Sequence, residues 1–239
     1  MSEICWRVDL GVVDYLQAWE LQRRLVVLRQ AGEIPDVLLF LEHPPTYTRG
    51  RSGKPEHLLA NPEELSRLGA RLVATDRGGD ITFHGPGQIV GYLIFDLSDL
   101  SALSRDVHLY LRRLEETLIR ALARFGIEAG RVAGLTGVWH REGKLGAIGV
   151  RVARWVTSHG FALNVSTDLG YFDRIVPCGI VGRRVASMEK VLGHPVDAGR
   201  VRDAVSAELG FVFHRQVLIV PPAALKQDLH VHARKTAAS

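Results

Sequence analysis

The order of helices and strands constrains the fold of this chain more than any other feature of its sequence. Residues 106–125 predict the clearest helix, because apolar residues recur on one side and Gly126 follows as a stop signal. Residues 137–165 then predict a strand, a turn and two further strands. Helices and strands mix along the chain without the regular βαβ alternation of a doubly wound or barrel fold. The expected class is therefore α/β of the α+β-like kind, with a mixed sheet.

The other predicted elements show no internal repeat, no low-complexity linker and no obvious domain boundary. Further helices are predicted at 14–31, from 61 and at 198–209, and further strands at 37–42, 72–75 and 89–97. Residues 46–54 predict a polar loop, and residues 77–88 a glycine-rich segment. A length of 239 residues fits one large domain or two small ones.

The composition is that of an ordinary globular protein, with 46% hydrophobic and 23% charged residues. Two cysteines, Cys5 and Cys178, do not make a disulfide framework, so we expect the chain to work in the cytoplasm. Residues 1–4 carry no basic-then-apolar leader, and no apolar run approaches the ~20 residues of a membrane helix. Neither secretion nor membrane insertion is expected.

The charge balance is basic, with a formal net charge of +4 and an isoelectric point of about 9.3. A basic surface favours an acidic partner, either nucleic acid or an acidic protein, although simple arginine richness explains it equally well. The chain has no run of Lys and Arg with interleaved aromatic residues, so nucleic acid is the weaker choice.

Cys178 is the candidate nucleophile. Pro177 stiffens the backbone before it and Gly179 removes side-chain bulk after it, so a bulky acyl group could reach the sulfur. A thiolate is the strongest nucleophile among the side chains when a neighbouring group lowers its pKa. The alternative is a small buried hydrophobic residue, and the flanking residues alone leave both interpretations open.

The segment 77–88 is a candidate ligand-binding loop. Its paired glycines let backbone N–H groups approach a ligand, and Arg77 adds a positive charge. It has neither the Gly-Lys-Ser/Thr of a phosphate-binding loop nor the GxGxxG of a dinucleotide site, and a plain glycine-rich hairpin is the alternative. His84, between Phe83 and a Gly-Pro-Gly turn, favours a role in binding.

Two further segments carry candidate residues. Lys144 leads from a turn into a strand, where it is either an active-site charge or a solvated one. Small residues within 146–149 leave room beside that strand for a slim apolar chain. His159 fits either a supporting base or a core histidine. The histidines are not spaced as metal ligands, so no metal site is expected.

Together these segments resemble the lipoyl(octanoyl) transferases, the acyl-carrier-dependent branch of the biotin and lipoate protein ligase superfamily. The matching segments are residues 42–48, 77–92, 144–164 and 177–180, and the resemblance covers roughly residues 10–215. It implies a single α/β domain with a larger and a smaller mixed sheet packed with helices. We therefore expect a catalytic domain over residues 1–220 and a partly disordered tail over 221–239.

The resemblance also implies roles for the candidate residues. Cys178 would carry the acyl group and Lys144 would activate it. The residues implied to line the acyl pocket are Arg77, Gly78, Gly79, Asp80, Ile81, Thr82, Phe83, His84, Ala147, Ile148, Gly149, Gly160, Phe161 and Ala162. His43 and His159 are expected to support that pocket.

The activity implied is a step of lipoate biosynthesis, the transfer of an octanoyl group from octanoyl-acyl carrier protein to a lysine of a lipoyl domain through a Cys178 thioester. The acceptors would be the lipoyl domains of 2-oxoacid dehydrogenases and the glycine cleavage H protein. ATP, metal ions, nucleic acid and membranes are not expected to take part. An ATP-dependent lipoate or biotin ligase, a cysteine acyl-hydrolase and a non-catalytic acyl-binding module stay open as alternatives.

Overall fold

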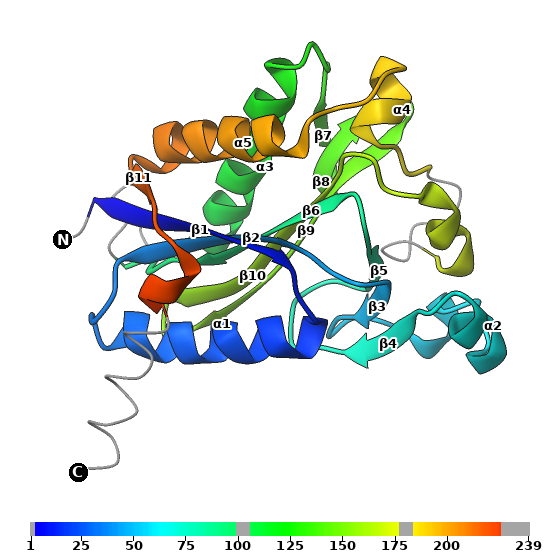
Figure 1. The fold of residues 1–239 in the computed structure, drawn as a ribbon, viewed down its shortest axis with the longest axis horizontal. Helices are drawn as coiled ribbons and strands as arrows, with labels where there is room; N and C mark the ends of the chain where they lie inside the picture. Colours follow the sequence, from blue (N-terminus) through cyan, green and yellow to red (C-terminus); the bar gives the residue numbers. More distant parts are fainter. Residues whose placement is uncertain (1–2, 99–105, 177–183, 226–239) are drawn as a thin grey trace.

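Two sheets of unequal size form the framework of the protein, and helices cover them (Figure 1). The structure, a computed structural model, describes residues 3–98, 106–176 and 184–225. Within these ranges, no helix combines the length and the apolar character that crossing a membrane requires.

The larger sheet has eight strands in the order β11-β1-β2-β6-β10-β9-β8-β7. In chain order these are β1 (Ile4–Val12), β2 (Asp36–Glu42), β6 (Gln88–Ile94), β7 (Gly130–Val132), β8 (Leu135–His140), β9 (Gly143–Ala153), β10 (Val156–Asn164) and β11 (Gln216–Ile219). Strand β1 pairs in parallel with β2 and β11, whereas the other neighbours pair antiparallel. The sheet is therefore mixed, with β6 and β10 at its centre.

The smaller sheet has three strands in the order β4-β3-β5. They are β3 (Thr46–Arg49), β4 (Arg71–Ala74) and β5 (Ile81–His84). Strand β3 pairs in parallel with β4 and antiparallel with β5, so this sheet is mixed as well. A larger and a smaller mixed sheet confirm the predicted fold class.

Helices cover both faces of the larger sheet (Figure 1). Helix α1 (Tyr15–Gln30) packs against β10 and β6 on one face, while α3 (Val107–Ala123) and α5 (Ala198–Phe213) pack together on the other. The shorter elements are α2 (Pro62–Arg67), α4 (Met188–Leu192), η1 (Pro55–His57) and η2 (Leu169–Arg174). Successive side chains of a strand point to opposite faces. Phe161 of β10 accordingly packs on the α3 side and Ala162 on the α1 side.

Local capping signals begin the helices where the sequence predicts. The side chains of Asp14 and Asp106 accept hydrogen bonds from the first turns of α1 and α3. Asn61 and Glu64 form a capping box at the start of α2. These starts are confirmed because each depends on residues close together in the chain.

Pairing between distant segments overrides other predictions. The polar loop predicted at 46–54 is wrong for residues 46–49, which form β3 by pairing with β4 and β5. Residues 81–84 of the glycine-rich segment form β5, and β1 and β11 were not predicted at all. In the expected tail, Leu225 is buried in the hydrophobic cluster on the α1 side, and residues 226–239 lie outside the described part of the chain.

Candidate active site

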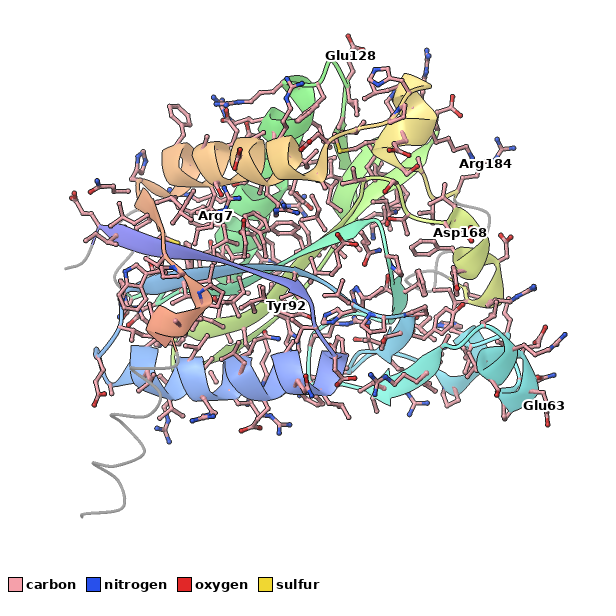
Figure 2. All side chains as sticks on the ribbon, in the orientation of Figure 1. Arg7, Glu63, Tyr92, Glu128, Asp168 and Arg184 are labelled. Carbon is pink, nitrogen blue, oxygen red and sulfur yellow. The ribbon has the colours of Figure 1, made fainter. Side chains whose placement is uncertain are left out.

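A cavity of about 230 Å³ lies where the segment 77–84 meets the centre of the larger sheet. Its wall consists of Tyr15, Arg77, Gly79, Asp80, Thr82, His84, Tyr92, Gly134, Leu135, Thr136, Lys144, Ala147, Ile148, Gly149, His159, Gly160, Phe161 and Ala162. Tyr92 stands in the interior of the molecule in Figure 2, whereas Arg184 reaches the surface. The cavity thus gathers side chains from α1, β5, β6, β9 and β10 around one space.

Most of the residues predicted to line an acyl pocket face this cavity. Three of them, Gly78, Ile81 and Phe83, are not part of its wall. Alternation along β5 explains two of these exceptions, because it turns Thr82 and His84 to the cavity and the other two into the core of the smaller sheet.

Small residues let the loop before β5 approach the larger sheet. The N–H of Gly78 donates to the carbonyl oxygen of Val150 at 2.9 Å. A Cβ at Gly149 would lie 2.9 Å from the carbonyl oxygen of Gly78, closer than packing allows. A Cβ at Gly160 would collide with the carbonyl oxygen of Gly91. The glycines of this wall therefore allow two backbone segments to pack in direct contact. The position of the loop before β5, which covers the cavity, depends on them.

Arg77 fastens that loop to the smaller sheet. Its side chain is buried, and its Nη2 donates to Thr48 Oγ1 at 2.9 Å. Its Nη1 donates to the carbonyl oxygen of Gly78 at 3.0 Å. The guanidinium thus brings a positive charge to the cavity wall while its hydrogen bonds hold the loop backbone in place.

Two histidines, His84 in the cavity wall and His43 in contact with it, are buried and neutral. His43 donates from Nδ1 to the carbonyl oxygen of Val13 at 2.7 Å, so its Nε2 accepts from the hydroxyl of Tyr92 at 2.8 Å. Burial lowers the pKa of His43 to about 4. His84 contacts Gln88 Oε1 through Nδ1 at 2.8 Å, and burial lowers its pKa well below the usual value. Both rings therefore orient neighbours through hydrogen bonds and carry no charge at neutral pH.

His159 adopts an unusual backbone conformation inside β10. Its φ of 59° lies in the left-handed region, and its N–H donates to Gln22 Oε1 at 2.7 Å. Its Nε2 contacts Asp76 Oδ1 at 2.7 Å. Burial lowers the pKa of His159, while the hydrogen bond from His159 lowers the pKa of Asp76. The pair is thus a neutral imidazole donating to a carboxylate, and His159 is both buried and part of the cavity wall.

Lys144 lies near the start of β9 and is only 7% exposed, so the alternative of a solvated hairpin charge is wrong. Its N–H donates to the carbonyl oxygen of Arg184 at 2.9 Å. Its Nζ lies 5.2 Å from the ring centroid of Trp139, close enough for a cation–π contact. A Cβ at Gly137 would lie 2.5 Å from Lys144 Cε, so the absence of a side chain there leaves the path of the lysine open.

Cys178 lies outside the described residues, and with it the predicted turn 177–180. The described chain resumes at Arg184, directly beside the backbone of Lys144. Cys5 is fully buried in the core, and burial raises the pKa of its thiol well above the usual value. It is therefore no candidate for a nucleophile, which leaves Cys178 as the cysteine to test.

The sequence analysis missed Tyr15, Asp76 and Tyr92. Tyr92 could have been found, because it lies within the matching segment 77–92. Tyr15 and Asp76 carry no such signal, since helix packing and the turn before Arg77 bring them to the site.

Comparison with known proteins identifies the family. The family model for the lipoyl protein ligase A/B catalytic domain matches residues 14–210. An octanoyltransferase of Koribacter versatilis is 50% identical over 214 residues, covering 88% of this chain and 85% of the relative. One of Rubrobacter xylanophilus is 54% identical over 199 residues, covering 82% and 88%. The chain belongs to the lipoyl protein ligase A/B family. It is an acyltransferase, and the resemblance to the octanoyl transferases is confirmed.

Solved structures agree with this membership at the level of the fold. A protein from T. acidophilum described as a putative lipoate protein ligase has a TM-score of 0.72 at 16% identity, covering 99% of this chain and 95% of that one. A lipoate-protein ligase A bound with ATP also has a TM-score of 0.72 at 16% identity, covering 96% and 92%. At 16% identity, these similarities show that the fold is shared and nothing further.

Proposed function

We propose that this chain moves an octanoyl group from octanoyl-acyl carrier protein to a lysine of a lipoyl domain, holding it in between as a thioester on Cys178. The observation that carries the proposal is the buried side chain of Lys144 in the wall of the cavity. An ammonium beside the sulfur would stabilise the thiolate and make it nucleophilic at neutral pH. The names of the relatives at about 50% identity support octanoyl as the group moved.

The first step exchanges one thioester for another. The Cys178 thiolate attacks the carbonyl carbon of the octanoyl group, a new C–S bond forms, and the bond to the phosphopantetheine sulfur breaks. The Lys144 ammonium gives its proton to the departing sulfur and becomes neutral. The energies of the two thioesters are similar, so this step is nearly balanced.

The second step makes an amide. The amine of the acceptor lysine attacks the acyl-enzyme, a C–N bond forms, and the C–S bond to Cys178 breaks. Neutral Lys144 takes the proton released by the amine, which restores the ammonium and thiolate pair. An amide is more stable than a thioester, so the two-step reaction runs forward without ATP or a metal ion.

Mass spectrometry tests the intermediate directly. The protein is incubated with octanoyl-acyl carrier protein and no acceptor, and an octanoyl mass is expected on the peptide that contains Cys178. Hydroxylamine should remove it, because it cleaves thioesters. An octanoyl adduct that persists in Cys178→Ala would contradict the proposal.

Two further measurements separate the alternatives. Transfer to a lipoyl domain that requires ATP would favour a ligase. Release of free octanoic acid in place of an octanoylated domain would favour a hydrolase. We expect an octanoylated domain in buffer without nucleotide.

The same proposal gives the basic charge a role. Acyl carrier proteins are acidic as a class, and the arginines that could receive one include Arg49, Arg51, Arg183 and Arg184, of which Arg183 lies outside the described residues. Arg51 and Arg184 are exposed, so they are available to a docking protein. Opposite charges on the two proteins would speed their encounter.

A further inference from the structure

His159 lies in the wall of the cavity, and a second pocket lies behind its hydrogen-bond partner Asp76. His159 lines the inner cavity, and Asp76, its hydrogen-bond partner at 2.7 Å, lines an outer pocket of about 370 Å³. The outer pocket opens between α1 and the β9–β10 hairpin, where Trp19, Gln22 and Ser158 also line it. The ring of His159 and its neighbours thus separate two spaces.

The ring of His159 is held from several sides. Asp76 fixes Nε2, Gln22 fixes the backbone N–H, and the rings of Trp19 and Tyr92 lie 6.2 and 6.0 Å from the imidazole centroid. A left-handed φ inside a strand is unfavourable for a residue with a side chain and persists only where the surroundings enforce it. The position of this side chain is therefore imposed by the fold.

The register of the sheet places His159 and the amine of Lys144 at opposite ends of the cavity. A Cβ at Gly137 would lie 2.5 Å both from the carbonyl oxygen of Gly146 and from Lys144 Cε, so the lysine runs forward along β9 to the level of Gly146. His159 pairs with Val150, four residues further along β9. At about 3.3 Å per residue, these levels are about 13 Å apart.

An octanoyl group fits that length. Its seven C–C bonds span about 9 Å when extended, because a bond of about 1.5 Å advances the chain by about 1.3 Å. A hydrogen bond of about 3 Å from Lys144 Nζ to the acyl carbonyl oxygen places the carbonyl carbon about 4 Å from the amine. The sum of about 13 Å brings the terminal methyl group to the level of His159 along β9.

We propose that His159, held by Asp76, is the specificity-determining residue that closes the acyl pocket and limits the acyl chain to about the length of an octanoyl group. The inference rests on the proposed function, because that function places the acyl carbonyl at Lys144. Longer chains are rejected because their terminal methylenes would have to displace a buried ring that is hydrogen-bonded to a carboxylate.

The test is His159→Gly. Glycine adopts a φ of 59° without strain, and we expect loss of the ring to open the inner cavity toward the outer pocket. The measurement is the kcat/KM for lauroyl-acyl carrier protein relative to the octanoyl donor. Each additional methylene buried in an opened channel is worth roughly fourfold in binding, so we expect this ratio to rise at least roughly tenfold over the wild-type ratio.

Two companion variants make the result specific. His159→Asn tolerates a positive φ and keeps part of the bulk, so its ratio should fall between those of the wild type and His159→Gly. It also serves if the glycine variant does not fold. Asp76→Asn keeps an oxygen that can accept from the imidazole but removes the charge, and its chain-length preference should stay like that of the wild type.

A binding measurement separates this inference from the proposed function. Calorimetric titration of each variant with free octanoic and lauric acids needs no transfer step. A gain in laurate affinity in His159→Gly supports the length limit even if Cys178 proves not to carry an acyl group. Unchanged ratios in both assays, in a glycine variant with a wild-type circular dichroism spectrum, would overturn it.

Discussion

The two ends of the cavity differ in how their buried polar groups are held. At one end, the amine of Lys144 reaches the cavity on a flexible stem and lies over the ring of Trp139. At the other end, the ring of His159 is held by a hydrogen bond to Asp76 and kept neutral by burial. The difference indicates separate roles, since an amine can exchange protons with a substrate while a fixed neutral ring defines the shape of the pocket.

The largest effect is expected from removing the amine. Lys144→Ala should lower octanoyl transfer by roughly 10²–10⁴-fold, the usual contribution of a positioned proton donor and acceptor. The same variant should slow alkylation of Cys178 by iodoacetamide at neutral pH, because less of the thiol is ionised. Both rates are measured by mass spectrometry.

Lys190→Ala is the matched control for this variant. Lys190 is exposed on α4, so its removal costs the same unit of charge outside the cavity. Near-normal rates of octanoyl transfer and of Cys178 alkylation are expected in Lys190→Ala. Normal transfer and alkylation in Lys144→Ala would show that the two ends of the cavity do not differ as inferred.

A smaller effect is expected from crowding the wall near the far end. In Gly160→Ala the added methyl group meets the carbonyl oxygen of Gly91, which is backbone and cannot swing aside. We expect a loss of about 1–3 kcal/mol in the free energy of unfolding, typical of overpacking. Urea denaturation measures it. Gly130→Ala is the control, because nothing lies within 4 Å of that position, and equal losses in the two variants would contradict the packing argument.

The neutral histidines predict a loss of stability in acid. The pKa of His43 is about 4 in the fold and about 6.5 in the unfolded chain, so the unfolded state binds more protons between these values. Stability from His43 is therefore complete above pH 6.5 and declines as the pH falls toward 4. Between pH 7 and pH 5 the loss should be about 2 kcal/mol.

The variant His43→Gln isolates this contribution. Glutamine can still donate to one neighbour and accept from another, but it does not titrate. The difference in unfolding free energy between pH 7 and pH 5 should therefore shrink by about 2 kcal/mol relative to the wild type. His84 and His159 act in the same direction, so some acid sensitivity is expected to persist in the variant.

The smallest effect is expected at the protein surface, outside both ends of the cavity. Transfer from octanoyl-acyl carrier protein should fall as salt is raised, because screening weakens the attraction between an acidic donor and exposed arginines. Arg51→Ala should lower the rate only a few-fold at low salt. A small octanoyl thioester without the carrier protein is the control and should be insensitive to salt. Equal salt dependence for both donors would exclude steering.

Much of the fold could be predicted from the sequence. Helix starts at Asp14, Asn61 and Asp106 follow from side chains that cap the next turn, and those contacts join residues two or three positions apart. The strand β3 could not be predicted, because its polar residues become strand only by pairing with β4 and β5. Contacts between distant residues leave no local pattern to detect.

The candidate site divides in the same way. The sequence by itself determined the family and its motifs, including Lys144 and the glycine-rich segment 77–88. The order and spacing of these motifs can be read along the chain without knowing the fold. Only the tertiary structure decided that Lys144 is buried, that Ile81 and Phe83 face a core, and that His159 lies in the cavity wall. The burial of Lys144 and its separation from His159 depend on the register of β9 against β10 and on the packing of α1. Both are set by contacts between residues that are distant in the chain.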